Sequence, residues 1–276
     1  MITLTASDVK KLRDMTGAGM MDCKSALTEA EGDLDKAVEV LRKKGQKLSL
    51  KRADRDAKEG AVIALVSNDK KHGVVVKLSC ETDFVAKNQE FVNLARDFAR
   101  IALAKLPADK EALLALDYNG ITIGEKVIEQ VGVIGEKVEI AGYEQLEAPQ
   151  IAPYIHIGNR AGVLVGLNKS DEKYFEAGRD VAMQVAAMRP AAVDKGDVSA
   201  ALIEKEIEIG KEQARQEGKP EGMLEKIAMG KLNKFYAEST LLNQSFVKDN
   251  KKSVRDYLQE LDKDLTVTNF KHIELG

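Results

Sequence analysis

The organisation of the chain follows from one stretch, Gly73-Val74-Val75-Val76-Lys77-Leu78-Ser79-Cys80-Glu81-Thr82-Asp83-Phe84-Val85-Ala86-Lys87. Its first half is an apolar run that predicts a strand, and its second half places an acid beside a large aromatic residue just before a helical pattern begins. Two interpretations are open. Asp83 and Phe84 either close a core at the strand-to-helix turn, or form an exposed pair at the tip of a rigid element.

An internal repeat connects this stretch with the second half of the chain. Ala95-Arg96-Asp97-Phe98-Ala99 matches Gly178-Arg179-Asp180-Val181-Ala182 at an offset of 83 residues, counted from Arg96 to Arg179. Each copy is expected to be helical and follows two apolar, strand-like runs, at 61–66 and 74–78 in the first copy and at 153–157 and 161–167 in the second. Hairpins followed by a helix, twice over, predict an α+β fold with two related halves and antiparallel sheets.

The repeat also bears on Asp83 and Phe84. The same offset places Thr82-Asp83-Phe84-Val85 against Val165-Gly166-Leu167-Asn168, which contains neither an acid nor an aromatic residue. A residue needed only to close the corner between sheet and helix should have a counterpart in the second copy. Because none is found, the functional interpretation gains equal standing with the packing interpretation.

The first 45 residues predict a small domain of three helices. Apolar residues recur at helical spacing from Val9, from Met20 and from Leu34, and Lys43-Lys44-Gly45 is expected to stop the third helix. Met20 and Met21 are adjacent, so they lie on different faces of a helix, and one of them is expected to face outward. A domain of this size usually presents a small apolar patch to a partner.

The rest of the chain is predicted to divide into a basic linker at 46–58, a first core half at 59–137 and a second core half at 138–276. Helical periodicity on both sides of Gly218-Lys219-Pro220-Glu221-Gly222 predicts an antiparallel helical hairpin inserted at about 197–236. Because its outer faces carry many charges, the hairpin is expected to project into solvent.

Composition and charge indicate a globular protein without a nucleic-acid-binding field. The 276 residues are 44% hydrophobic, and the 32% of charged residues leave a net charge of only −3. This balance argues against DNA binding, and RNA contact through the basic linker is not favoured because such a run is more often a solvated connector. No stretch is long and apolar enough for a membrane span, and the N-terminus lacks the features of a signal peptide, so a cytoplasmic location is expected.

Motifs for metal, cofactor or catalytic chemistry are not found in the sequence. His72, His156 and His272 have no companion ligands at metal-binding spacing, and Cys23 and Cys80 lie in different segments. The glycines before Met20 lack the preceding strand and the Gly-Lys-Ser/Thr ending of a phosphate loop. A binding protein without catalytic residues, metal or cofactor is therefore predicted. For His156 a packed role and a contact with a partner both stay open.

Two long motifs carry a resemblance to a known family. Leu12-Arg13-Asp14-Met15-Thr16-Gly17-Ala18-Gly19-Met20-Met21-Asp22-Cys23-Lys24-Ser25-Ala26-Leu27 and the segment from Cys80 to Lys87 resemble the signature motifs of the bacterial translation elongation factor Ts family. The resemblance extends over essentially the whole chain. It implies a ubiquitin-associated-like N-terminal domain, a core of two related α+β subdomains and a protruding coiled coil.

The resemblance also implies a function, which is guanine-nucleotide exchange on elongation factor Tu. The protein would bind this partner both in its GDP-bound form and in its nucleotide-free form. Asp83 and Phe84 would insert near the magnesium site of the partner's G domain, with Thr82 and Val85 shaping the loop. Lys77 stands where the family often has an acid, a departure at the strand edge that leaves this loop intact.

Further contacts follow from the same resemblance. Arg13, Met20 and Met21 would dock the N-terminal domain on the G domain, and His156 is the candidate contact of the second subdomain. A homodimer is left open. The alternative function is an RNA-associated translation scaffold that uses the basic linker and the hairpin.

Overall fold

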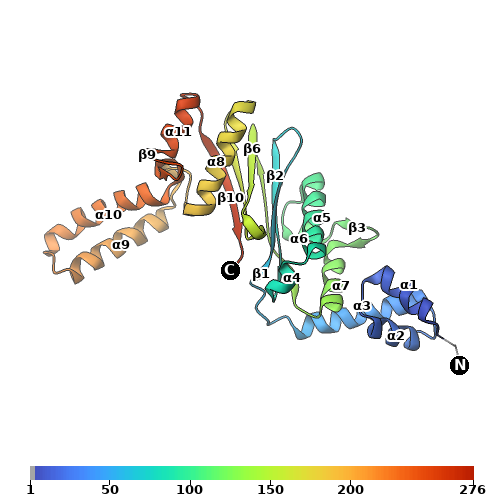
Figure 1. Cartoon of the computed structure of the whole chain (residues 1–276). Helices are drawn as coiled ribbons and strands as arrows, with labels where there is room; N and C mark the ends of the chain where they lie inside the picture. Colours follow the sequence, from blue (N-terminus) through green and yellow to red (C-terminus); the bar gives the residue numbers. More distant parts are fainter. Residues whose placement is uncertain (1–3) are drawn as a thin grey trace.

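Two three-stranded antiparallel sheets lie face to face at the centre of the protein (Figure 1). The structure is a computed structural model and describes residues 4–276. The first sheet has the order β1-β2-β5 and the second has the order β10-β7-β6. The strands are β1 Glu59–Val66, β2 His72–Cys80, β5 Val138–Glu147, β6 Gln150–Ile155, β7 Ala161–Leu167 and β10 Val267–Glu274. Within each sheet, the central strand pairs antiparallel with both neighbours.

One long helix covers the outer face of each sheet, so the core has four layers (Figure 1). These helices are α5, Gln89–Lys105, and α8, Glu172–Met188. Both ends of α8 lie 83 residues after the corresponding ends of α5, and the residues that follow, Leu106 and Arg189, both adopt left-handed backbone conformations. The predicted α+β class and the helical repeat are therefore confirmed.

The facing sides of the two sheets form a separate apolar layer. Val62 and Val75 of the first sheet pack in one cluster with Ile151 and Leu164 of the second. The sheets come so close that a Cβ added at Gly162 would lie 2.9 Å from Val62 Cγ1. Apolar contacts on both faces explain why these strands read as nearly continuous hydrophobic runs.

The N-terminal helices are joined to the core by one long helix. They are α1 Ala6–Thr16, α2 Met20–Glu29 and α3 Leu34–Lys51. The prediction that the third helix stops at Gly45 is wrong. At this residue α3 crosses α7, Ile123–Ile134, so closely that a Cβ on Gly45 would lie 2.9 Å from the Ile128 carbonyl oxygen. The glycine thus serves a helix crossing, and residues 46–51 of the predicted linker are helical.

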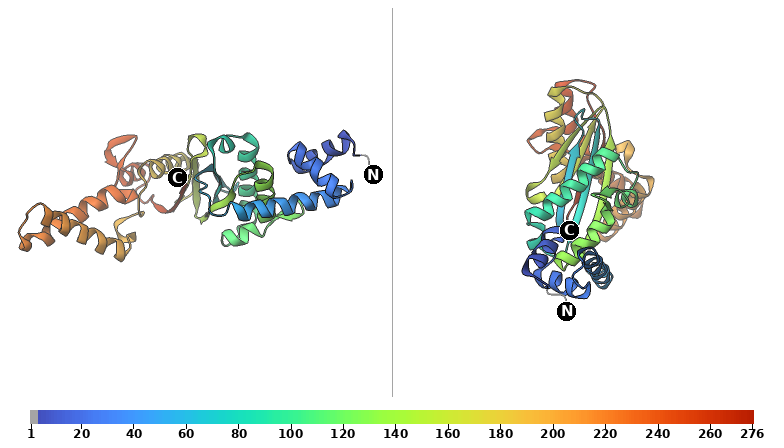
Figure 2. Two further views of the ribbon diagram at one scale, coloured as in Figure 1. Left: turned by 90° about the horizontal axis from the view of Figure 1, so that it is seen from below. Right: turned by 90° about the vertical axis from the view of Figure 1, so that its right-hand side faces the viewer.

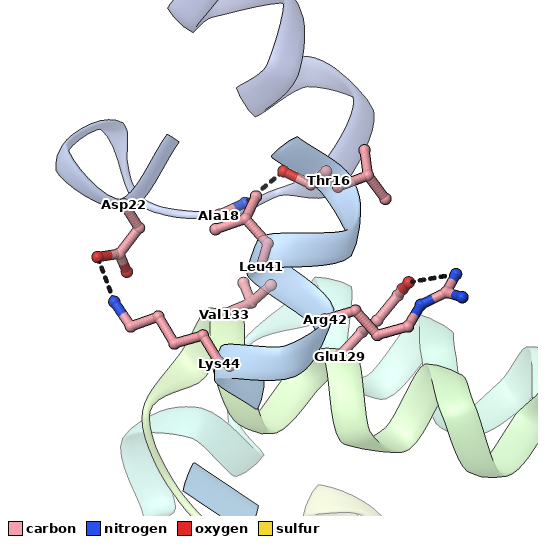
Figure 3. Close-up of a pocket in the computed structure, with 10 residues that line it drawn as sticks. Thr16, Ala18, Asp22, Leu41, Arg42, Lys44, Glu129 and Val133 are labelled. Atoms are coloured by element: carbon pink, nitrogen blue, oxygen red, sulfur yellow. Dashed lines mark hydrogen bonds and ion pairs between the residues drawn. The ribbon is translucent and has the colours of Figure 1, made fainter. Parts of the chain in front are cut away.

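Polar contacts flank this crossing (Figure 3). Arg42 on α3 pairs with Glu129 on α7, with 3.8 Å between Nη2 and Oε1. Lys44 on α3 donates to Asp22 on α2 at 2.5 Å. The long helix is therefore tied both to the small helical domain and to the core.

The predicted helical hairpin projects from the opposite end of the protein (Figure 2). It consists of α9, Ala200–Gln216, and α10, Leu224–Ser239. The two helices approach closely where a Cβ on Gly210 would lie 3.1 Å from Ala228 Cα. Within residues 4–276, none of the helices has the length and apolar character needed to cross a membrane.

The strand β5 does not follow the predicted boundary between the two core halves. β5 pairs with β2 in the first sheet, although the boundary between 137 and 138 assigns it to the second half. The division into domains as such stays a prediction.

Short elements complete the chain. They are α4 Asp83–Ala86, α6 Lys110–Leu114, β3 Asp117–Tyr118, β4 Ile121–Thr122, β8 Ser245–Phe246, β9 Asp249–Ser253 and α11 Val254–Leu261.

Candidate functional site

The corner between β2 and α5 carries a one-turn helix, α4, that the second copy of the repeat lacks. Eight residues, 81–88, separate β2 from α5, whereas four, 168–171, separate β7 from α8. The predicted match of 82–85 with 165–168 is therefore wrong, because 165–167 lie within β7. The conclusion drawn from that match is nevertheless supported, since the shorter corner closes without an acid or an aromatic residue.

Glu136 holds the start of this corner. Its carboxylate accepts two hydrogen bonds from Thr82, one from the backbone N–H at 3.0 Å and one from Oγ1 at 2.7 Å. Thr82 is also the N-cap of α4, since its Oγ1 accepts from the Val85 N–H at 3.5 Å. Glu136 thus fixes both the backbone and the side chain of the residue that begins the turn.

Glu81 forms a second anchor beside the first. Its Oε1 accepts from Arg52 Nη1 at 2.7 Å and from the Lys137 backbone N–H at 2.6 Å. Burial raises the pKa of Glu81, but these two donors outweigh it and leave the pKa below its usual value. The carboxylate therefore stays ionised at neutral pH and ties the end of β2 to the segments that follow α3 and α7.

Phe84 extends into solvent from this anchored corner. Its side chain is 83% exposed, whereas Val85 and Ala86 pack partly against the core of the first half. Asp83 accepts a hydrogen bond from Lys87 Nζ at 2.6 Å, which lowers the pKa of its carboxyl. The corner thus presents an apolar ring next to an ionised acid, and the interpretation of Phe84 as a core residue is excluded.

Cys80, at the end of β2, is a buried structural thiol. Its Sγ donates to the Thr82 carbonyl oxygen at 3.2 Å, and burial raises its pKa to about 12. Such a thiol stays protonated and unreactive at neutral pH. Residues 4–276 contain no group of three or more His, Cys, Asp or Glu side chains that could hold a metal ion.

A second surface lies between α1 and α2 of the N-terminal domain. Met20 is 61% and Met21 70% exposed, so both side chains face solvent, where one was expected to. With Val9 and the cationic Arg13 and Lys24 they line a shallow groove. The three residues predicted to bind a partner from this domain therefore share one apolar groove with a basic rim.

His156 lies in the turn between β6 and β7, and its side chain is exposed. Its Nδ1 and the Tyr154 hydroxyl are 3.0 Å apart. The next residue, Ile157, is 85% exposed, and sequence reasoning missed it. Its position in the turn Ile157-Gly158-Asn159, directly after a strand-like run, could have indicated that it is exposed.

The corner and this turn lie at the same end of the two sheets (Figure 1). Residues of both border one groove. Asp83 and Lys87 line it from α4, and Asn159 and Arg160 line it from the turn. Arg160 pairs across to Glu59, with 3.5 Å between Nη1 and Oε2. The structure therefore brings Asp83 to the same groove as the turn that follows His156, whereas Phe84 and His156 themselves are not among the residues that line it.

Comparison with known proteins matches this arrangement to one family. A family model described as Elongation factor TS matches residues 81–276. The chain is 54% identical to the elongation factor Ts of Christiangramia forsetii over 276 residues and to that of Cytophaga hutchinsonii over 278, in each case over the whole of both chains. Its identity to the elongation factor Ts of Porphyromonas gingivalis is 46% over all of this chain and 99% of the relative. The chain belongs to the elongation factor Ts family.

Membership of the elongation factor Ts family makes the protein a factor of translation elongation. The family model begins at Glu81, so it includes α4 with its anchors from Glu81 and Glu136. The full-length relatives extend the match through the N-terminal helices with Met20 and Met21. Both candidate surfaces therefore lie in segments that align with the elongation factor Ts relatives.

Proposed function

We propose that this protein releases GDP from elongation factor Tu, so that GTP can bind, and that it does so in the cytoplasm. The loop Thr82-Asp83-Phe84-Val85 inserts near the magnesium site of the partner. The N-terminal groove with Arg13, Met20 and Met21, together with His156, holds the partner in place. The observation that carries the proposal is the exposed Phe84 ring on an anchored corner that the second copy of the repeat lacks.

The chemistry of the partner explains why one ring and one acid can suffice to start release. Magnesium requires a nearly octahedral shell of oxygens and tolerates little displacement of its ligands. A ring that shifts the surrounding segments, with the Asp83 carboxylate beside it, weakens the hold on the metal and therefore on the diphosphate. By linkage, any loss of GDP affinity caused by this protein equals the loss of its own affinity caused by GDP.

The size of the binding free energy indicates how much the loop contributes and how much the two holding surfaces contribute. Burial of one phenylalanine contributes about 1.5 to 3 kcal/mol, and each tenfold change in nucleotide affinity corresponds to about 1.4 kcal/mol. Phe84 alone thus accounts for about one or two decades of GDP affinity. The N-terminal groove and the second core half supply the rest of the binding free energy.

The test compares Phe84→Ala with Met20→Ala in stopped-flow release of fluorescent GDP from elongation factor Tu. Phe84→Ala is expected to lower the maximum release rate about ten- to a hundredfold while the half-saturating concentration changes little. Met20→Ala is expected to raise the half-saturating concentration and to leave the maximum rate intact. An unchanged maximum rate for Phe84→Ala would falsify the role of the ring, and no acceleration by the wild type would exclude exchange activity altogether.

A further inference from the structure

We propose that Glu136 and the Glu81–Arg52 pair are positioning residues that hold Phe84 in the orientation needed for nucleotide release and connect it to the N-terminal helix α3. This inference rests on the proposed exchange function and adds to it the residues through which the loop is aimed. None of these side chains needs to touch the partner for this role.

The need for anchors follows from the size of α4. A single helical turn fixes several backbone dihedrals for one hydrogen bond, so it is unstable by itself. Of the four residues of α4, Val85 and Ala86 pack partly against the core, whereas the Phe84 side chain is 83% exposed and gains little from packing. The orientation of the ring therefore depends on the polar contacts at Glu81 and Thr82, the two residues that precede the turn.

Charge makes these contacts stronger than ordinary hydrogen bonds. Glu136 accepts both of its bonds from Thr82, and Glu81 accepts one of its two from the Arg52 guanidinium. The Arg52 and Glu81 side chains are only 30% and 17% exposed, so water screens the pair less than an open surface pair. Hydrogen bonds to ionised groups contribute about twice as much as neutral ones.

The same contacts connect the loop to α3 and α7. Arg52 is the C-cap residue of α3, and Glu136 and Lys137 follow directly on the C-cap of α7. Lys137 Nζ also donates to the carbonyl oxygens of Ala53 and Arg55, at 3.0 and 3.1 Å. Because α3 and α7 are locked together at their glycine crossing, the N-terminal domain and the loop share one support. When that domain docks on the partner, the orientation of Phe84 is fixed with it.

Glu136→Gln tests the inference, because it keeps the shape of the side chain and removes its charge and one acceptor. We expect the maximum rate of GDP release from elongation factor Tu to fall about tenfold, equivalent to about 1.4 kcal/mol in the barrier. The half-saturating concentration should stay within about threefold of the wild type, since the holding surfaces are unchanged. The double variant Glu136→Gln with Phe84→Ala should be no slower than Phe84→Ala alone, because both changes act through the same ring.

Glu144→Gln is the matched control. It removes an equal charge from β5, where Glu144 pairs with Lys271 at 2.7 Å, away from the loop, and it should release GDP at the wild-type rate. Should Glu136→Gln fail to fold, Arg52→Met removes the other anchor and is measured in the same way. A maximum rate equal to that of the control, or losses that multiply in the double variant, would overturn the positioning role. Failure of wild type and Phe84→Ala to differ would instead overturn the proposed function.

Discussion

Phe84 and Ile157 are exposed apolar side chains that lie in connections between elements of the two sheets. A single exposed apolar residue is common on protein surfaces and by itself indicates nothing. What distinguishes Phe84 is the set of hydrogen bonds made by the two residues before the turn. Thr82 donates to Glu136 through both its backbone N–H and its hydroxyl, and the Glu81 carboxylate accepts from the Lys137 N–H. A ring held out by such contacts is available to a partner without prior rearrangement, which lowers the entropy lost on binding.

Asp194, like Glu81, is a carboxylate that accepts hydrogen bonds from an arginine and a second donor, and it predicts how stability depends on pH. It accepts from Arg255 Nη2 at 2.6 Å and from Asn243 Nδ2 at 2.7 Å, at the base of the hairpin. Burial raises the pKa of Asp194, but these donors and the Lys195 N–H outweigh it and bring the pKa below its usual 3.8. Because the lower pKa belongs to the folded state, ionised Asp194 stabilises the fold above about pH 4. This contribution is lost as the pH falls through the folded-state pKa.

We therefore expect Asp194→Asn to reduce the free energy of unfolding at pH 7 by about 1 kcal/mol, a value that allows for solvent screening of a partly exposed pair. The difference from the wild type should shrink as the pH is lowered below about 4. Urea unfolding at a series of pH values measures it. Glu208→Gln, which breaks only an exposed pair with Lys211, should have little effect at any pH, and a difference for Asp194→Asn that persists at low pH would contradict the assignment.

At the residue scale, the sequence pointed to exposed residues in the loop and at the methionines, but not to the side chains that hold the loop in place. Phe84 and Met20 stand in local patterns, a strand end and a helix face, which sequence periodicity reveals. Glu136 lies 54 residues from Thr82, and Arg52 lies 29 residues from Glu81. Such long-range polar contacts leave no periodic signal, because nothing in the local sequence distinguishes Glu136 from other surface acids or Arg52 from other surface bases.

At the scale of elements, the crossing of α3 and α7 shows how one residue type serves two purposes. A glycine after two lysines is typical of a helix C-terminus, where it adopts a left-handed conformation. Gly45 instead lies inside α3 and faces Gly132 of α7, where any side chain would contact backbone atoms. The two uses of glycine look the same in the sequence, and only the presence of the second helix distinguishes them.

The crossing predicts that Gly45→Val separates α3 from α7. With a Cβ 2.9 Å from a carbonyl oxygen, the helices must move apart, and overpacking of this kind costs about 1 to 3 kcal/mol. Trypsin should then cleave after Lys47 and Lys51 faster than in the wild type, which gel electrophoresis follows over time. Gly196→Ala, where an added Cβ meets no atom within 4 Å, is the control. Equal cleavage of all three proteins would mean that the crossing does not hold the long helix in place.

At the scale of the whole molecule, the packing of one sheet on the other joins the two halves. Strands β1, β2 and β7 are apolar on both faces, and one face meets a helix while the other meets the opposite sheet. The sequence predicted the strand-like runs at 61–66, 74–78, 153–157 and 161–167 and their antiparallel arrangement, because these depend on local patterns, but it did not predict β5 as a strand. It did not indicate that the sheets face each other or that β5 joins β2, because both depend on contacts between segments far apart in the chain.

Gly162 tests this interface. In Gly162→Val the new side chain would collide with Val62 and Val75 of the opposite sheet, so we expect the free energy of urea unfolding to fall by about 1 to 3 kcal/mol. Gly230→Ala, in the open part of α10, should instead stabilise slightly, by up to about 1 kcal/mol, because alanine favours helix. If Gly162→Val unfolded at the same urea concentration as the wild type, close contact of the sheets would be refuted.

The different lengths of the strand-to-helix connections in the two copies of the repeat have a consequence for the evolution of the protein. Helices α5 and α8 begin and end in register, yet only the first copy has four extra residues before its helix. Since the shorter connection already completes the second copy, the additional turn is not required for chain closure. Selection can therefore act on its exposed residue Phe84 through the partner surface, so that this residue and its binding site can change together, while Val85 and Ala86 stay under the constraint of core packing.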